Sequence, residues 1–518
     1  MHSSTSVRTL RALIFHGYLL RGTGSNVYNA NLARALVRLG WDVHLLCQER
    51  AADELDWVHA VGRWRDGELT VEQLRGSEGE GQLTVYNPDI GGLLPVYVHD
   101  DYPGFEVKTF ADLSDAELDR YISANVDAVQ DVARHAGNPD AALANHLVMG
   151  PLILARAGLR FAAKVHGSAL EYTVKPNPRF LPFAEEGIAG ASAVLVGSRH
   201  TAESLWRTLP GLDLEAKTRL GPPGVDTTEF APREPGQAVA AVQRLADQID
   251  AGGREAGLGR DNEAAVGALR DFAAADGPRV VFVGKLIVSK GVDLLLAAWP
   301  LVHCANPGAR LMLVAFGAYE DGLRRLLAAL ERGDATGALE VARLGWALEG
   351  GPQEPLKILR SFLSKPPPGY FDAAGAAAGS VELAGRLEHD EVAELLPAAD
   401  ALVMPSTFPE SFGMVAVEAA ACGVLPVSAG HSGMLEVSRR IADSLPGDVA
   451  PLISFPVAEG AVTELAARLR AWLAVDPQRR REIGAALARR VDELWSWEGV
   501  ARGAIAASAG QLDDLPKP

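Results

Sequence analysis

The chain has 518 residues, of which 48% are hydrophobic and 22% charged, and its formal net charge is −17 at pH 7. This length exceeds what one hydrophobic core usually organises, so two large domains are expected, and the composition is that of a folded globular protein. The negative charge argues against nucleic acid as a partner and against adhesion of the whole surface to an acidic membrane.

The N-terminal segment is interpreted as a first buried strand and not as a leader peptide. Arg8 and Arg11 precede a short apolar run, but His16 interrupts this run and no small-residue cleavage site follows it. No apolar run elsewhere approaches the ~18 residues that cross a bilayer. Three widely spaced cysteines show no metal-ligand spacing, and reduced thiols agree with a cytoplasmic location. The first elements predicted are strand Leu10–His16, loop Gly22–Asn26, helix Val27–Leu39 and strand Asp42–Cys47.

Strands and helices then alternate along the chain, which predicts parallel sheets. In such sheets ligands bind beyond the carboxyl ends of the strands, so polar residues at those ends are candidate site residues. In the first half, further strands are predicted to end at Asn145-His146, at His166 and at Ser198. In the second half, strands are predicted at Val280–Val283, Arg310–Ala315, Val381–Ala384, Ala401–Met404 and Leu425–Ser428.

Three segments interrupt this alternation. The first lies near residues 85–120, where Asn87–Phe110 is dense in Gly, Pro, Tyr and Asp. Residues 232–275 are predicted to be a helical insertion and linker, and Gly345–Gly379 has the composition of a surface loop. The predicted domains are therefore residues 1–275, with the first two insertions, and residues 276–490.

The strongest chemical signal is the segment Pro409–Met414 with the alanine-rich sequence that follows it. Seven residues separate Glu410, in the predicted loop, from Glu418, in the predicted helix. A helical path of this length spans ~12 Å, about the reach of a diphosphate that joins two sugar rings. The amides at the helix start, near Phe412–Met414, are suited to hold the diphosphate. The alternative is that Glu410 caps the helix and Glu418 is a solvated helix residue.

Two lysines, Lys285 and Lys290, follow the strand Val280–Val283 in a glycine-containing turn. An acidic protein that binds an anionic ligand needs such local positive charge, and each lysine acts as a point charge toward phosphate. The alternative is an ordinary exposed turn between a strand and a helix.

Together these motifs resemble the large family 4 of retaining glycosyltransferases, which has the GT-B fold. In the second half the resemblance rests on Gly284–Gly291, Pro405-Ser406, the spacing of Glu410 and Glu418, Phe412-Gly413 and Gly423. In the first half it rests on the loop Gly22–Asn26, on His166-Gly167 and on Gly221–Asp226. The resemblance implies an α/β protein of two facing Rossmann-like domains with a cleft between them that holds the donor. It also implies that residues 491–518, with a helix over Trp495–Gln511, cross back to the first domain.

The resemblance assigns roles to individual residues. It places Lys285 and Lys290 on the donor diphosphate, Glu410 on the hydroxyls of the donor sugar and Glu418 on the ribose. The remaining donor-binding residues that it implies are Gly22, Gly24, Arg386 near the base, and Ser411, Phe412, Gly413 and Met414 with their amides. His166 is expected near the reacting centre, so His166, Lys290 and Glu410 form the expected catalytic set. The family usually has Arg where Lys285 stands, and Thr23 separates the two glycines of the first loop.

The remaining polar residues at strand ends and in loops are not assigned to the donor site. Asn145 and His146 either face the acceptor or serve packing. Asp100-Asp101 lacks a further carboxylate at a useful spacing and is interpreted as a polar loop, so no metal site is expected. No tightly bound cofactor is expected either, since the co-substrate is a nucleoside-diphosphate sugar, with UDP or GDP as the nucleotide.

The predicted function is retaining transfer of a sugar from this donor to a hydroxyl of a small molecule, a glycan or a glycolipid. The alternatives are a sugar-nucleotide epimerase or hydrolase on the same fold and a non-catalytic sugar-binding paralogue. The segment Asn87–Phe110 is predicted to shape the choice of acceptor. The expected location is cytoplasmic, with peripheral attachment to a membrane left open, as is the oligomeric state.

Overall fold

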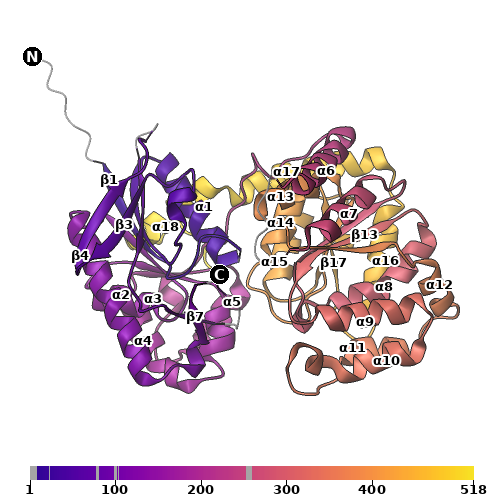
Figure 1. Cartoon of the computed structure of the whole chain (residues 1–518), viewed down its shortest axis with the longest axis horizontal. Coiled ribbons are helices and arrows are strands. Elements are labelled where there is room, and N and C mark those ends of the chain that lie inside the picture. Colours follow the sequence, from indigo (N-terminus) through magenta and orange to yellow (C-terminus); the bar gives the residue numbers. More distant parts are fainter. Residues whose placement is uncertain (1–8, 23, 78–80, 98–101, 103, 253–259) are drawn as a thin grey trace, which may run out of the picture. The chain divides into compact units, whose positions relative to one another are not determined.

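The computed structural model describes residues 9–22, 24–77, 81–97, 102, 104–252 and 260–518. The chain divides into two compact units (Figure 1). The first comprises Met1–Gly224 and Trp495–Pro518, and the second comprises Val225–Leu494. Each unit is built around one large sheet, as the alternation of strands and helices predicts.

The first unit contains a nine-stranded sheet in the order β11-β10-β9-β8-β1-β2-β5-β3-β4. Its strands are β1 (Leu10–Phe15), β2 (Trp41–Leu46), β3 (Ala60–Arg65), β4 (Glu68–Gln73), β5 (Leu83–Asn87), β8 (Ala141–Asn145), β9 (Ala162–Val165), β10 (Ala193–Val196) and β11 (Thr218–Leu220). Every pairing is parallel except that of β3 with β4. The central strands are mostly buried, because helices cover both faces of the sheet. Two short strands, β6 (Leu93–Val96) and β7 (Glu106–Thr109), form a separate parallel pair.

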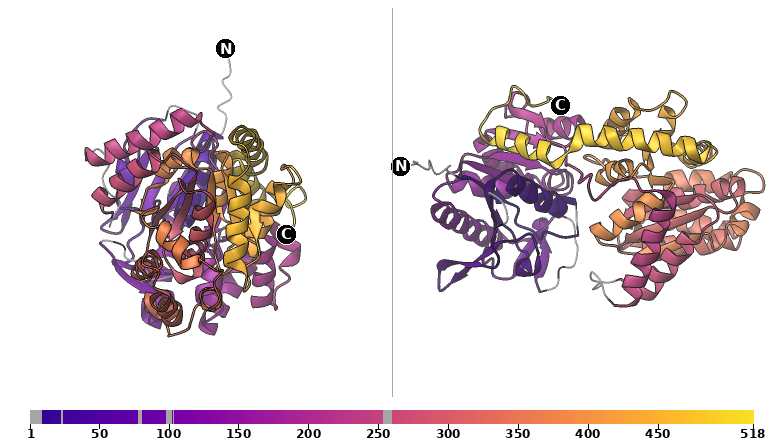
Figure 2. Two further views of the ribbon diagram at one scale, coloured as in Figure 1. Left: turned by 90° about the vertical axis from the view of Figure 1, so that its right-hand side faces the viewer. Right: turned by 90° about the horizontal axis from the view of Figure 1, so that it is seen from above.

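Helices cover the two faces of this sheet separately. Leu32 and Leu36 of α1 (Gly24–Arg38) share a buried cluster with Trp497 of α18 (Trp497–Ser508). In Figure 2 the yellow α18 lies against this unit. The opposite cluster contains residues of α2 (Asp115–His135), α3 (Gly150–Arg156), α4 (Leu181–Gly190) and α5 (Arg199–Thr208). The π-helical turn η3 (Ala169–Val174) follows β9, and the short turns are η1 (Ala52–Glu54), η2 (Phe110–Asp112), η4 (Pro178–Phe180) and η5 (Glu215–Lys217).

The second unit contains a six-stranded parallel sheet in the order β14-β13-β12-β15-β16-β17. Its strands are β12 (Arg279–Lys285), β13 (Arg310–Phe316), β14 (Val381–Gly385), β15 (Ala401–Met404), β16 (Leu425–Ala429) and β17 (Ser454–Phe455). Its helices are α6 (Pro235–Asp250), α7 (Asn262–Ala273), α8 (Val292–Ala305), α9 (Glu320–Glu331), α10 (Ala335–Leu344), α11 (Lys357–Ser364), α12 (Tyr370–Ala376), α13 (His389–Leu395), α14 (Met414–Ala421), α15 (Ser432–Ala442), α16 (Ala461–Leu473) and α17 (Pro477–Trp495). Short turns are η6 (Val288–Lys290), η7 (Gly345–Glu349), η8 (Leu396–Ala398) and η9 (Ala450–Ile453).

The boundary between the compact units differs from the one expected near residue 275. Helices α6 and α7 pack on each other, and they contact α13, η8 and β14 of the second sheet. Their apolar stripes are therefore buried in the second unit, which begins at Val225. The chain returns to the first unit at Trp495 and not at residue 491, and the Ser496 side chain caps the start of α18.

The segment Gly345–Gly379 is mostly helical, although its composition is that of a surface loop. It contains η7, α11 and α12. Leu359, Phe362 and Leu363 of α11 are buried, and α11 contacts α8 and α16. The apolar residues at helical spacing therefore outweigh the prolines, which lie between the helices.

Candidate functional site

Two loops of the second unit lie side by side at the carboxyl ends of β12 and β15. The first is η6, which follows β12 and carries Lys290 at its end. Gly291 has φ +66°, and a Cβ there would collide with the carbonyl oxygen of Pro405 in the second loop. The N–H of Thr407 donates to the carbonyl of Ser289 at 2.9 Å. Because only a glycine permits this approach, the two loops are held in contact.

Lys290 and Glu410 meet across these loops. The ammonium of Lys290 forms an ion pair with Glu410 Oε1, and the two side chains are 26% and 23% exposed. Ser406 Oγ donates to the same carboxylate oxygen at 2.7 Å. Burial acts to raise the pKa of Glu410, but the charge and hydrogen bond of Lys290 and the Ser406 hydroxyl outweigh it and lower the pKa. Glu410 is therefore an ionised, partly accessible carboxylate.

The loop from Glu410 to Gly413 leads into α14 with a fixed geometry. The Glu410 N–H donates to Ser432 Oγ at 2.9 Å, and the Glu410 carbonyl accepts from the N–H of Gly433 at 2.9 Å. Gly413 has φ +104°, so the chain turns sharply into the helix at Met414. The first N–H groups of a helix have no partner within the helix, so α14 begins with donors suited to an anion.

Glu418 lies one turn inside α14 and is buried against a histidine that the sequence interpretation did not single out. His389 Nε2 lies 2.9 Å from Glu418 Oε1, and the Glu418 side chain is 5% exposed. Burial acts to lower the pKa of His389, yet the negative charge of Glu418 and the hydrogen bond to it outweigh burial and raise the pKa. The only sequence signal for His389 is its position just after the strand β14. Arg386, from the same loop, is paired with Glu388 at 3.1 Å.

In the first unit, histidines gather at the carboxyl ends of β1, β8 and β9. Asn145 Nδ2 donates to the Phe15 carbonyl at 3.2 Å, and this orients its Oδ1 toward His166 Nε2, 2.8 Å away. The carbonyl oxygen can only accept, so His166 Nε2 carries the proton. The ring of His146 lies 5.0 Å from that of His166 and 5.7 Å from that of His16. The structure thus brings His166, Asn145 and His146 together, as the strand-end argument predicts.

All three histidines are neutral. Burial lowers the pKa of His166 and of His146 well below the usual value, and lowers that of His16 to about 4. His146 has φ +68°, and neither of its ring nitrogens has a hydrogen-bond partner in the part of the chain that the structure describes. Burial also lowers the pKa of Lys164 to about 7. The sequence interpretation missed Lys164 and His16 as site residues, although His16 ends the first predicted strand as His166 ends its own.

The glycine loop of the first unit is held by asparagines of α1. His16 Nε2 lies 3.0 Å from Asn26 Oδ1, and Asn26 Nδ2 donates to the Arg21 carbonyl at 2.7 Å. Gly22 has φ +96°, and Gly24 begins α1. Among the described residues, no three His, Cys, Asp or Glu side chains are grouped as metal ligands, while Asp100 and Asp101 lie outside those residues.

Residues 376–486 match the family model described as glycosyl transferases group 1. This span contains the Glu410 and Glu418 segment and His389. The chain is thus similar over this span to glycosyl transferases group 1. Lys285 and Lys290 lie outside the matched span.

Two curated relatives are similar to this chain. It is 30% identical over 227 residues to a GDP-mannose-dependent monoacylated alpha-(1-6)-phosphatidylinositol monomannoside mannosyltransferase of Corynebacterium glutamicum, covering 43% of this chain and 44% of the relative. It is 30% identical over 355 residues to a D-inositol 3-phosphate glycosyltransferase of Geodermatophilus obscurus, covering 68% of this chain and 60% of the relative. The aligned regions thus span about half the length of these relatives.

The fold of the chain is GT-B, as the sequence resemblance implies. HepE of Anabaena, solved in complex with UDP and glucose, superposes with a TM-score of 0.55 at 15% identity, over 97% of this chain and 100% of HepE. In the part of the chain that the structure describes, no helix combines the length and the apolar character needed to span a membrane.

Proposed function

We propose that the chain is a family 4 retaining glycosyltransferase that moves a sugar from a nucleoside-diphosphate sugar to an acceptor hydroxyl. The observation that carries this proposal is the contact of Lys290 with Glu410 beside the start of α14. One cation, one carboxylate and a set of helix-start amides are the groups that a diphosphate attached to a sugar requires. The match of residues 376–486 to glycosyl transferases group 1 supports the same assignment.

In the proposed complex Lys290 leaves Glu410 for the donor diphosphate, and Lys285 adds a second positive charge. Glu410 then accepts hydrogen bonds from hydroxyls of the donor sugar. Glu418 accepts from the ribose, and His389 holds its carboxylate in place. Departure of the nucleoside diphosphate develops negative charge on the leaving phosphate. Preorganised positive charge and the amides at Phe412–Met414 stabilise that charge as it forms.

The proposed reaction retains the anomeric configuration and uses no covalent protein intermediate. The acceptor hydroxyl attacks on the face that the diphosphate leaves, and its proton passes to the departing phosphate oxygen. His166 contacts the donor sugar in this proposal. Because its Nε2–H is committed to Asn145, the free lone pair is on Nδ1, and His166 accepts a hydrogen bond from a sugar hydroxyl.

The proposed donor carries UDP or GDP. HepE binds UDP and glucose, whereas the mannosyltransferase of Corynebacterium glutamicum is GDP-mannose-dependent by name. The names of both curated relatives describe inositol-containing acceptors, which supports a polyol hydroxyl as the acceptor group.

Nucleotide binding tests the donor assignment directly. The thermal unfolding of the protein is measured with UDP, GDP, ADP and their sugar conjugates. A ligand at about one hundred times its dissociation constant adds ~2.7 kcal/mol of stability. Stabilisation by one nucleotide family supports the proposal, and the absence of stabilisation by any of them contradicts it.

Product analysis separates the proposal from its two alternatives. With the stabilising donor and a mixture of polyol and glycan acceptors, the proposal predicts a glycosylated product with the donor's anomeric configuration, detected by mass spectrometry and NMR. An epimerised donor or free sugar as the only product identifies the epimerase or hydrolase. Binding without any turnover identifies a non-catalytic sugar-binding protein.

A further inference from the structure

The first unit contains a cavity whose lining residues include none of the proposed donor-binding residues. Its volume is about 240 Å³. It is lined by Gln48, Arg50, Arg63, Asn87, Pro88, Asp89, Ile90, Gly92 and Phe105. About eight water molecules fill this volume in the liquid, so it accommodates a small charged group and the atoms bonded to it. A whole nucleotide sugar exceeds it.

Side-chain amides fix the walls of this cavity. Gln48 Nε2 donates to the Pro88 carbonyl at 2.9 Å, and Asn87 Nδ2 donates to the Glu49 carbonyl at 2.9 Å. These bonds tie the segment after β2 to the segment after β5. One buried and one partly buried hydrogen bond thus fix the walls of the cavity, at whose surface the side chain of Arg50 is exposed.

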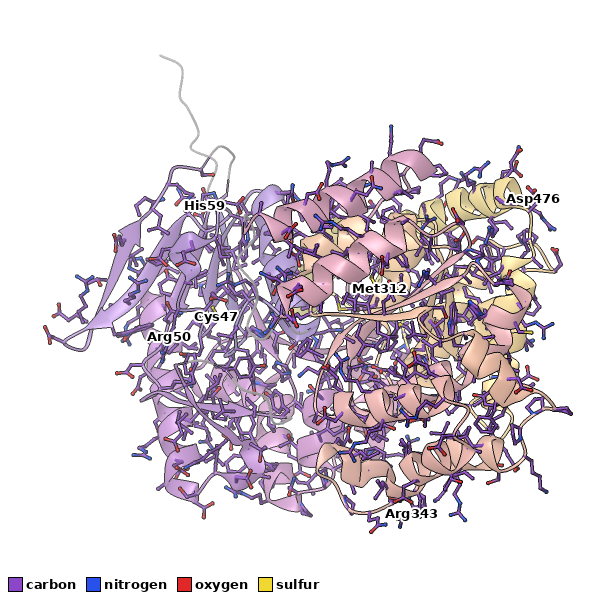
Figure 3. The ribbon with its side chains drawn as sticks, turned by 45° about the vertical axis from the view of Figure 1, so that its right-hand side comes forward. Cys47, Arg50, His59, Met312, Arg343 and Asp476 are labelled. Carbon is purple, nitrogen blue, oxygen red and sulfur yellow. The ribbon has the colours of Figure 1, made fainter. Side chains whose placement is uncertain are left out.

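Two guanidinium groups supply positive charge to the cavity. That of Arg50 lies over the ring of Phe105, 3.9 Å from the centroid. It has no ion pair among the residues that the structure describes. Gly104, with φ +82°, makes room for it, because a Cβ there would stand 2.5 Å from Arg50 Nη1. Figure 3 labels Arg50 close to Cys47, just beyond the end of β2.

Among the residues that the structure describes, the carboxylates near this cavity leave most of that charge unbalanced. Arg63 is paired with Asp53 at 3.6 Å, and these side chains are 39% and 46% exposed. An exposed pair of this kind contributes at most about 1 kcal/mol, so an incoming anion can replace Asp53. Asp89, the one acid among the described lining residues, is exposed, and its Oδ1 accepts the Gly91 N–H at 2.9 Å. The cavity therefore favours an anion.

The cavity lies along the same edge of the sheet as the three histidines. Gln48 and Asn87 stand at the carboxyl ends of β2 and β5, which follow β8 and β1 in the strand order. Tyr18 contacts both the cavity wall and the group of histidines. Its carbonyl accepts the Gln48 N–H at 2.7 Å, and its ring lies 5.4 Å from the ring of His146. A ligand held in the cavity therefore lies beside the residues at the strand ends where chemistry is proposed.

We propose that this cavity binds a phosphate group carried by the acceptor, with Arg50 and Arg63 as its ligands. This inference rests on the proposed function, because it gives the acceptor of that reaction its chemical class. A guanidinium recognises phosphate with paired N–H donors, and the stacking of Arg50 on Phe105 holds its fork in place. The segment Asn87–Phe110 contributes most of the lining residues, so it would select the acceptor through this charge.

Binding measurements on the full chain test the proposal. Isothermal titration calorimetry compares inositol 3-phosphate with free inositol, using the wild type, Arg50→Gln and Arg63→Gln. Arg120→Gln is the matched control, since Arg120 on α2 is exposed and absent from the cavity lining. We expect about a tenfold or greater loss of inositol 3-phosphate affinity in each cavity variant and none in the control. Gly104→Ala keeps both charges but displaces Arg50, and it should also weaken binding.

Further probes identify the source of the phosphate. Inorganic phosphate measures what the arginines recognise without a polyol, and glycerophosphoinositol presents the phosphodiester of a lipid headgroup in soluble form. Tighter binding of the monoester supports a free sugar or polyol phosphate, and tighter binding of the diester supports a lipid headgroup. If inorganic phosphate alone binds as tightly as both esters, the cavity is a simple anion site and the acceptor proposal is overturned.

The donor experiment separates a failure of this inference from a failure of the proposed function. If the protein transfers sugar but Arg50→Gln and Arg63→Gln leave the KM of a phosphorylated acceptor unchanged, the cavity has no acceptor role although the function stands. Equal affinity of the wild type for inositol and inositol 3-phosphate leads to the same conclusion. If no nucleotide binds, the proposed function fails, whatever the cavity variants do.

Discussion

Removal of the Lys290 ammonium should cost most of the affinity for a nucleoside diphosphate. In Lys290→Ala the diphosphate loses a charge-assisted hydrogen bond, which contributes ~1.5–3 kcal/mol. The change corresponds to roughly a 10- to 100-fold rise in the dissociation constant, because 1.4 kcal/mol is a factor of ten. Glu410 adds to the loss, since its carboxylate is then unpaired beside the phosphates. Calorimetric titration with the nucleotide that stabilises the wild type measures the effect.

Glu410→Gln is the informative counterpart of this variant. The amide keeps the size of the side chain and a hydrogen-bond acceptor for Ser406, but it no longer binds the charge of Lys290. The nucleoside diphosphate should therefore bind this variant as tightly as the wild type or more tightly, whereas turnover of the sugar nucleotide should fall. Wild-type affinity in Lys290→Ala, or an equal loss of diphosphate affinity in both variants, would refute the assignment of the two residues to diphosphate and sugar.

Three other variants test interactions that stabilise the fold of the two units. Glu391→Gln breaks the ion pair between Glu391 and Arg260, whose side chains are 2% and 1% exposed. This substitution should lower the free energy of unfolding, measured in denaturant titrations, by about 3–5 kcal/mol. The pKa of His389 is raised in the folded protein, so its ion pair with Glu418 stabilises the fold fully below pH ~6.5. This contribution is lost as the pH rises through the folded pKa of His389. The stability difference between the wild type and His389→Gln should therefore shrink above that pH, and a constant difference would contradict the ion pair. Gly224→Ala places a Cβ 2.8 Å from the indole of Trp497 and should destabilise the packing of α18 by about 1–3 kcal/mol, measured by thermal unfolding.

The strand-end argument explains how much of the first unit could be predicted. His166 and Asn145 follow from local patterns, because each stands where a run of apolar residues ends. Their hydrogen bond does not follow, since it depends on β8 and β9 being neighbours in the sheet. His16 joins them only because β1 pairs with β8, a contact between strands more than one hundred residues apart. Local sequence thus supplies the candidates, and strand order selects those that act together.

The misplaced boundary has a related cause. The apolar stripes of α6 and α7 predict helices with one buried face, but they do not say which sheet buries it. Because the two helices precede β12 in the chain, their position in the sequence favours the first domain. They pack on α13 and β14, which come more than one hundred residues later. The segment Gly345–Gly379 is predicted to be a surface loop for a similar reason. Its proline run is typical of a loop, but the apolar face of α11 is buried by contacts with α8 and α16, which lie far from it in the sequence.

The ion pair of Lys290 with Glu410 adds an interaction between two residues that the sequence motif treats separately. The sequence pattern assigns each residue its own part of the donor, whereas in the structure the two charges neutralise each other. A nucleoside diphosphate without a sugar must take Lys290 away from Glu410 and leave that carboxylate without a counter-charge, although the Ser406 hydroxyl still donates to it. A complete sugar nucleotide replaces both interactions, since its phosphates meet the lysine and its hydroxyls meet the carboxylate. The ion pair should therefore weaken binding of the diphosphate product relative to the donor, and so favour product release once the sugar has been transferred.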